Sequence, residues 1–170
     1  MTAWTTITSP LGDLLLVGEP GEDGTSLASL TSLSMPGRRG ATAVRDDWSH
    51  DPTLFADVAD QVRAYFAGER VEFRIPFTPG GSAFQRQVWQ ALEEIPYGTS
   101  TTYGELTARI GLPRERVQAV GAAIGANPLL LVRPCHRVIG ADGSMRGYAG
   151  GVERKVQLLT LEGVLQPTLM

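Results

Sequence analysis

The chain has 170 residues, of which 42% are hydrophobic and 19% are charged, and its formal net charge is −3 at pH 7. This length suits one domain or two small ones, and the composition is typical of a globular protein with a buried core. No apolar run approaches the roughly 20 residues that a membrane span requires. The opening MTAWTTITSP lacks the basic start and apolar core of a secretory signal. We therefore expect a cytoplasmic protein without a membrane partner.

Charge is divided unevenly along the chain. Residues 1–81 contain 6 arginines and 11 acidic residues, whereas residues 82–170 contain 8 arginines and 1 lysine against 7 acidic residues. The second half is therefore modestly basic, which is compatible with contacts to phosphate groups but does not by itself identify a partner.

The first half predicts an α/β domain. A Pro-Gly turn between two short β-type runs is the pattern of a hairpin, and helical spacing of apolar residues follows Asp51 and Pro52. In chain order we predict strands at Trp4–Thr8, Asp13–Val17 and 25–35, a helix from 51 to Gly68, and a strand at 71–77.

The stretch TPGGS (78–82) breaks this pattern and predicts a boundary between domains at 1–80 and 81–170. The second domain reads as mainly helical, with Ser82 capping a first helix. A second helix begins after Thr101 or Thr102 and ends at Gly111, and a third ends near Asn127. The last two form either a helix-turn-helix or an ordinary helical hairpin.

The stretch LVRPCHRVIG (131–140) holds the only cysteine, directly before one of two histidines. One cysteine cannot form an internal disulfide, and these three residues cannot complete a structural zinc site, so we expect no metal. Cys135 could be a small buried residue, but an adjacent imidazole can also activate a thiol. Arg133, His136 and Arg137 favour the activated thiol, because a thiolate benefits from a cationic setting.

The motif PCHRV (134–138) resembles that of the methylated-DNA–protein-cysteine methyltransferases, or O6-alkylguanine-DNA alkyltransferases. The resemblance includes Asn127-Pro128, GYAGG (147–151), and the longer stretches FQRQVWQALEEIPYGTSTTYGEL and ERKVQLLTLEG. It implies a ribonuclease-H-like α/β domain followed by a mainly α domain with a helix-turn-helix. It also implies stoichiometric, irreversible transfer of an alkyl group from O6-alkylguanine, and from O4-alkylthymine, in double-stranded DNA. No cofactor is implied, and by analogy the protein is a monomer that can cluster on DNA.

The resemblance assigns roles to individual residues. Cys135 would accept the alkyl group, and His136 would deprotonate it through a water molecule. Glu162 would orient His136, and Asn127 would brace the network. Without the resemblance, the sequence favours a solvated helix end for Glu162, and Asn127 before Pro128 is also a good helix terminator. Residues expected to bind the substrate base are Tyr148, Val138 and Ala149, and the expected DNA contacts are Tyr103, Gln118, Arg114 and Arg137.

The chain departs from the family pattern on the predicted recognition helix. An arginine usually fills the gap left by the rotated base, but counting from Asn127 places Gln118 there, and counting from Tyr103 places Val117 there. Arg114 lies one turn before Gln118 and could reach the same face, whereas Arg116 points elsewhere. Arg133 stands where an aliphatic residue is common, so it must reach solvent, phosphate or a carboxylate.

Two other classes of function remain open at this point. An alkyltransferase-like protein binds alkylation damage without reacting, but such proteins replace the acceptor cysteine. A cysteine hydrolase would need an acyl substrate, for which the sequence offers no motif.

Overall fold

The computed structural model describes residues 1–35, 37, 42–70, 72–78, 80–145 and 147–166. The chain divides into two compact units, Met1–Pro79 and Gly80–Met170. Each unit has its own secondary structure and its own buried side chains. No helix in the described ranges is long and apolar enough to cross a bilayer.

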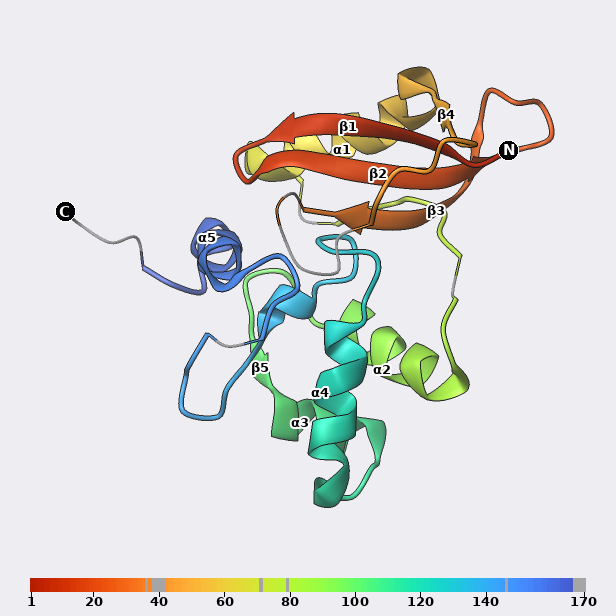
Figure 1. The fold of residues 1–170 in the computed structure, drawn as a ribbon. Helices are drawn as coiled ribbons and strands as arrows, with labels where there is room; N and C mark the ends of the chain where they lie inside the picture. Colours follow the sequence, from red (N-terminus) through yellow and green to blue (C-terminus); the bar gives the residue numbers. More distant parts are fainter. Residues whose placement is uncertain (36, 38–41, 71, 79, 146, 167–170) are drawn as a thin grey trace. The chain divides into compact units, whose positions relative to one another are not determined.

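The first unit is built on a four-stranded sheet with the strand order β3-β2-β1-β4 (Figure 1). The strands are β1 (Ala3–Ser9), β2 (Gly12–Pro20), β3 (Leu27–Ser34) and the short β4 (Ser49–His50). The first three pair antiparallel, and β4 runs parallel to β1. The predicted hairpin and third strand are confirmed.

One helix covers a face of this sheet (Figure 1). The Asp51 carboxylate accepts from the amide of Leu54 (3.3 Å) and caps a 3-10 turn at Pro52–Phe55, which continues as α1 (Ala56–Phe66). Proline at the first helical position has no amide to leave unsatisfied, so the sequence Asp-Pro starts a helix well. The predicted helix is confirmed, and Gly68 follows it with a φ of 77°.

The strand predicted at 71–77 is wrong for residues 72–77, and residue 71 is not among the described residues. Here Phe77 makes an isolated parallel bridge to Leu30. The Leu30 amide donates to the Pro76 carbonyl oxygen (2.7 Å), and the Thr78 amide donates to the Leu30 carbonyl oxygen (3.4 Å). Pro76 has no amide to donate, so it cannot extend this contact into a ladder.

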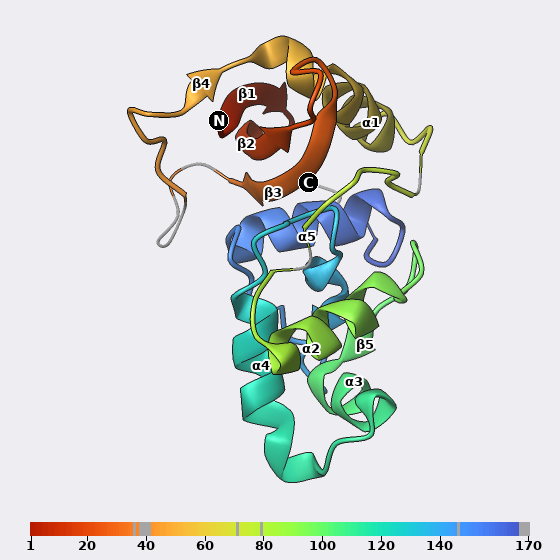
Figure 2. The ribbon, with the colours of Figure 1, turned by 90° about the vertical axis from the view of Figure 1, so that its right-hand side faces the viewer.

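The second unit is mainly helical, and Figure 2 shows three of its helices, α2, α3 and α4, side by side. Its described residues form α2 (Ala83–Glu93), α3 (Tyr103–Ile110), α4 (Val117–Gly125) and α5 (Val152–Leu161). Ser82 and Gln85 form a reciprocal capping box at α2. Thr102, not Thr101, caps α3 by accepting from the Glu105 amide (3.1 Å).

Short elements place the cysteine beside α3. A 3-10 turn at Arg114–Arg116 (η2) joins α3 to α4, and another, η3 (Cys135–Arg137), holds the cysteine itself. Directly after η3, strand β6 (Val138–Ile139) pairs in parallel with β5 (Thr101–Thr102). This pairing fixes the start of α3 next to the end of the cysteine motif.

Candidate active site

A single asparagine shapes the segment that leads to Cys135. The Asn127 Nδ2 atom donates to the carbonyl oxygens of Leu129 (3.3 Å) and Arg133 (3.1 Å) and to Cys135 Sγ (3.3 Å). Its Oδ1 atom accepts from the Leu129 amide (3.1 Å). Asn127 therefore contacts the thiol directly, and it lies two residues beyond the end of α4.

The same segment contains a strained residue. Leu131 has a φ of 71° and is the one non-glycine residue in the described ranges with a positive φ. For a leucine this conformation costs about 1–3 kcal/mol. The side chain is only 2% exposed, so its burial together with the Asn127 hydrogen bonds offsets the strain.

The thiol is buried and uncharged at rest. Cys135 is 3% exposed, and this burial raises its pKa to about 11. The Asn127 hydrogen bond and the positive charges of Lys155 and Arg133 act in the opposite direction, but burial dominates. A base is therefore needed before this sulfur can act as a nucleophile.

His136 and Glu162 form a buried pair beside the thiol. His136 Nε2 lies 2.8 Å from Glu162 Oε2, and both side chains are fully buried. Burial lowers the pKa of His136 below its usual range, against the opposing effect of Glu162. The imidazole is therefore neutral near pH 7. With Nε2 donating to the carboxylate, Nδ1 is an acceptor, and it has no hydrogen-bond partner among the described residues.

Arg137 holds the other side of Glu162. Its Nε and Nη2 atoms donate to the two carboxylate oxygens (2.7 and 3.0 Å), and Nη1 donates to the Ile95 carbonyl oxygen (2.6 Å). The guanidinium also lies 5.7 Å from the centre of the Tyr97 ring. These internal contacts correct the prediction that Arg137 touches DNA, because the guanidinium is buried and bound within the unit.

Arg133 is paired, as its burial requires. Its Nε atom donates to Glu93 Oε2 (3.2 Å), and its guanidinium lies 4.6 Å from the Trp89 ring centre. Trp89 is itself fixed by donating to the Ala123 carbonyl oxygen (2.8 Å). The sequence left solvent, a phosphate or a carboxylate as partners of Arg133, and in the structure its partner is the carboxylate of Glu93.

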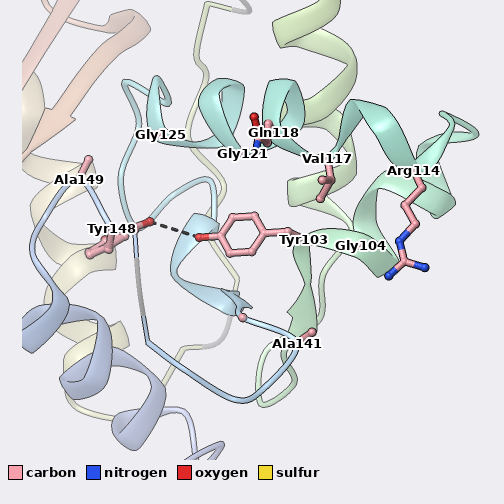
Figure 3. A pocket seen from close by; sticks show the side chains of 12 residues that line it. Tyr103, Gly104, Arg114, Val117, Gln118, Gly121, Gly125, Ala141, Tyr148 and Ala149 are labelled. Atoms are coloured by element: carbon pink, nitrogen blue, oxygen red, sulfur yellow. Dashed lines mark hydrogen bonds between the residues drawn. The ribbon is translucent and has the colours of Figure 1, made fainter.

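A pocket of about 740 Å³ gathers most of the predicted DNA and substrate residues (Figure 3). Tyr103 stands in its middle, and Arg114 and Tyr148 lie toward opposite ends. The lining residues are Tyr103, Gly104, Arg114, Val117, Gln118, Gly121, Gly125, Gly140, Ala141, Gly147, Tyr148 and Ala149. The pocket thus combines α3, η2, α4 and the loop that follows the cysteine motif.

Glycines make room for the central tyrosine. A Cβ atom at Gly147 would lie 3.0 Å from the Tyr103 hydroxyl, and one at Gly121 would lie 3.8 Å from the ring. The Tyr103 hydroxyl donates to the Gly147 carbonyl oxygen (3.5 Å; Figure 3). The close approach of the backbone at Gly147 therefore depends on the absence of a side chain.

Tyr148 connects the pocket to the buried pair. It lines the pocket, and its ring packs edge-on against His136 with 6.3 Å between the ring centres. Cys135 is buried and is not part of the lining. The predicted residues therefore divide between this pocket and the buried interior, where Cys135 contacts Asn127 and His136 contacts Glu162.

Sequence reasoning did not single out Lys155. This residue is the only lysine of the chain, it is fully buried on α5, and its Nζ atom donates to the Val138 carbonyl oxygen (2.5 Å). Lys155 lies on the buried face of α5 together with Leu158 and Leu159. These leucines follow it by three and four positions, so helical periodicity in the sequence could have revealed that Lys155 is buried. No group of three metal-ligating side chains occurs in the described part of the chain.

Two family models match the chain. The model of the 6-O-methylguanine DNA methyltransferase ribonuclease-like domain matches residues 2–79, and that of the DNA binding domain matches residues 83–164. A methylated-DNA–protein-cysteine methyltransferase of Mycolicibacterium paratuberculosis is 45% identical over 95% of this chain and 93% of its own length. Another, of Methanosarcina acetivorans, is 43% identical over 91% and 94%.

Solved structures agree with these matches. The structure of Mycobacterium tuberculosis OGT in complex with DNA superposes with a TM-score of 0.82 at 44% identity, covering 95% of this chain and 93% of that one. A structure of Mycobacterium tuberculosis O6-methylguanine methyltransferase superposes with a TM-score of 0.84 at 43% identity, covering 98% and 96%.

Proposed function

Since the chain belongs to the methylated-DNA–protein-cysteine methyltransferase family, we infer that it repairs alkylated DNA by direct transfer of the alkyl group to its own cysteine. DNA is its partner. We assign Cys135 as the acceptor. The observation that carries this assignment is the buried thiol held at 3.3 Å by Asn127 and followed in the chain by the His136–Glu162 pair.

The chemistry follows from that arrangement. The proton of the Cys135 thiol passes to His136, and the sulfur attacks the alkyl carbon of O6-alkylguanine. The S–C bond forms as the C–O6 bond breaks, and its electron pair goes to the guanine, which takes up a proton at a ring nitrogen. Because the thioether product is stable, each molecule reacts once and no cofactor is required.

A water molecule between His136 and Cys135 carries the proton in this proposal. The buried Nδ1 atom of His136 has no acceptor or donor within the described residues, and buried polar atoms of this kind are commonly satisfied by an ordered water. Glu162 binds Nε2 of His136, so Nδ1 is the ring nitrogen that can accept the proton of the Cys135 thiol.

The pocket is the place for the rotated base. Tyr148 and Ala149 line it, and we assign Tyr148 to the guanine, near its N3, and Ala149 to the alkyl group. The Val138 carbonyl would accept from the exocyclic amine of the guanine. Tyr103 would contact the phosphate beside the rotated nucleotide, and α4 would enter the minor groove as the second helix of a helix-turn-helix.

The remaining assignments follow the family resemblance. We place the protein in the cytoplasm and expect a monomer that can cluster on double-stranded DNA. Its substrates are O6-alkylguanine and O4-alkylthymine. The non-reacting, damage-binding alternative is not favoured, because the chain retains a cysteine at the acceptor position and its relatives are named as methyltransferases.

The test is intact-protein mass after mixing with a duplex that contains O6-methylguanine. We expect a gain of one methylene mass per chain that saturates at one, and Cys135→Ala should show none while still binding the duplex. A mass gain by Cys135→Ala would remove Cys135 as the acceptor. Turnover without a mass gain would indicate a hydrolase, and binding alone would indicate a damage-binding protein.

A further inference from the structure

A buried arginine lies two residues before Cys135. The Arg133 side chain is 2% exposed, and its Nε atom donates to Oε2 of Glu93 (3.2 Å), a side chain that is 36% exposed. The guanidinium lies 4.6 Å from the centre of the Trp89 ring, and its Nη1 atom donates to Asn127 Oδ1 (3.5 Å). Asn127 in turn donates to the Cys135 sulfur (3.3 Å). Hydrogen bonds therefore connect the Glu93 carboxylate at the surface to the buried thiol.

A role in folding alone does not explain the charges of Arg133 and Glu93. Burial lowers the pKa of Arg133, against the opposing effect of Glu93, but an arginine stays charged at every working pH. A buried ion pair commonly contributes no more to stability than apolar side chains of similar volume. Glu93 is also the last residue of α2, where the helix dipole disfavours a negative charge.

The charge of Arg133 acts on the thiol. Burial raises the pKa of Cys135, and the hydrogen bond from Asn127 acts against it. The positive charges of Lys155 and Arg133 also lower this pKa. In the other direction, Cys135 raises the pKa of Arg133, so the guanidinium and the thiolate stabilise each other. Because Glu93 binds the same guanidinium, its negative charge reduces the positive field at the sulfur.

We propose that Arg133 is a positioning residue whose guanidinium stabilises the negative charge that forms on the Cys135 sulfur, and that Glu93 limits this effect. The proposal rests on the assignment of Cys135 as the acceptor. The thiol proton passes to His136, and the S–C bond forms as the C–O6 bond breaks. Arg133 and Glu93 exchange no proton in this sequence, and neither lines the pocket. By donating to Oδ1 of Asn127, Arg133 also helps to keep the Nδ2 donor directed at the sulfur.

Substitutions of the two partners should change the rate in opposite directions. Arg133→Met removes the positive charge and should slow methyl transfer at neutral pH by about tenfold, the effect of one pKa unit of the thiol. Glu93→Gln keeps an acceptor for Arg133 but removes the negative charge, so it should accelerate transfer by about threefold. This second effect is smaller because water screens the half-exposed carboxylate.

The matched control is Glu94→Gln, which removes the same charge from the neighbouring exposed position and should leave the rate unchanged. If the pair of Arg133 and Glu93 served only to hold the structure together, disrupting it from either side would slow transfer. The sign of the Glu93→Gln effect therefore separates an electrostatic role from a structural one.

A second measurement reports the charge of the sulfur without DNA. Cysteine labelled with ¹³C at Cβ gives one resonance in this chain, and its chemical shift follows the ionisation of the thiol. The comparison is made about one pH unit below the wild-type pKa of about 11. There, Glu93→Gln should be more ionised than the wild type, Arg133→Met less ionised, and Glu94→Gln equal to the wild type.

Unchanged or decreased ionisation in Glu93→Gln, or slower transfer by this variant, would overturn the proposal. This result decides the question even if Arg133→Met fails to fold. A wild-type protein that never gains methyl mass would instead refute the acceptor assignment, while the ¹³C resonance would still report how the two charges act on the thiol.

Discussion

At the scale of single residues, Glu162 is the centre of the site. Its carboxylate binds His136 on one side and two nitrogen atoms of Arg137 on the other. A bidentate arginine fixes the plane of a carboxylate, and the carboxylate then fixes the tautomer and orientation of the imidazole. The neutral His136 can therefore take a proton without first losing one.

Replacing Glu162 by Gln should slow transfer by about a hundredfold or more, because a correctly oriented general base contributes that much. An amide can present its NH₂ group to Nε2, which would move the imidazole proton to Nδ1. Stopped-flow transfer rates check the kinetics, and the affinity for damaged DNA should be nearly unchanged. A well-folded Glu162→Gln protein with wild-type kinetics would make Glu162 an ordinary helix-end residue.

The sequence was sufficient to single out Cys135 as the candidate acceptor, together with its nearest partners, but not the charges around them. Recognisable motifs contain all four of these residues: Cys135, His136, Asn127 and Glu162. In the structure, Cys135 contacts Asn127, and His136 contacts Glu162. The direction of Arg137 depends on tertiary contacts, because a basic residue in a basic half is equally compatible with DNA and with an internal carboxylate. Its pairing partner lies 25 positions away along the chain.

At the scale of elements, the connection between α3 and α4 decides how the pocket is lined. The counts from Tyr103 and from Asn127 differ by one residue, and the 3-10 turn η2 lies between these two positions. It presents Arg114 to the same pocket as Gln118. Arg116, from the same turn, instead lies over the Phe84 ring at 4.8 Å. Two residues are therefore candidates for filling the gap left by a rotated base.

Substitutions at Gln118 and Arg114 distinguish these candidates. If Gln118 fills the gap, Gln118→Arg should accelerate transfer or strengthen binding, and should steepen the salt dependence by about one counterion if the arginine also neutralises a phosphate. If Arg114 fills it, Arg114→Ala should be severe and Gln118→Arg nearly silent. Stopped-flow rates on one duplex measure both. No effect from either substitution would mean that α4 and η2 do not supply this group.

The starts of two helices were predictable because a cap determines each of them. Ser82 and Asp51 start their helices with their own side chains, and these local hydrogen bonds can be read from the sequence. The stretch VEFRIPF was misleading because alternation is necessary for a strand but not sufficient. A strand also requires a partner with amides to pair, and Pro76 interrupts that pairing.

At the scale of the whole molecule, the two units differ in charge as well as in fold. The acidic half of the sequence corresponds closely to the α/β unit, and the modestly basic half corresponds to the helical unit with the pocket. The proposed DNA contacts of Tyr103, Gln118 and Arg114 all lie in the basic half. The division of charge, which is uninformative alone, thus agrees with the location of the site.

The burial of Cys135 also bears on how long each molecule remains usable. A protein that reacts once is spent by any reaction of its thiol, including oxidation. Peroxide attacks thiolates, and a thiol with a pKa of about 11 that is 3% exposed offers few of them to solvent.

We therefore expect Cys135 to remain reduced under peroxide for much longer than an exposed thiol in the same protein. A matched comparison is the double variant Cys135→Ala/Ser100→Cys, in which the only thiol occupies an exposed position. Mass spectrometry of both proteins over time gives the two oxidation rates, and equal rates would contradict the expectation. The interior position that makes a base necessary for reaction would then also preserve the acceptor until it meets damaged DNA.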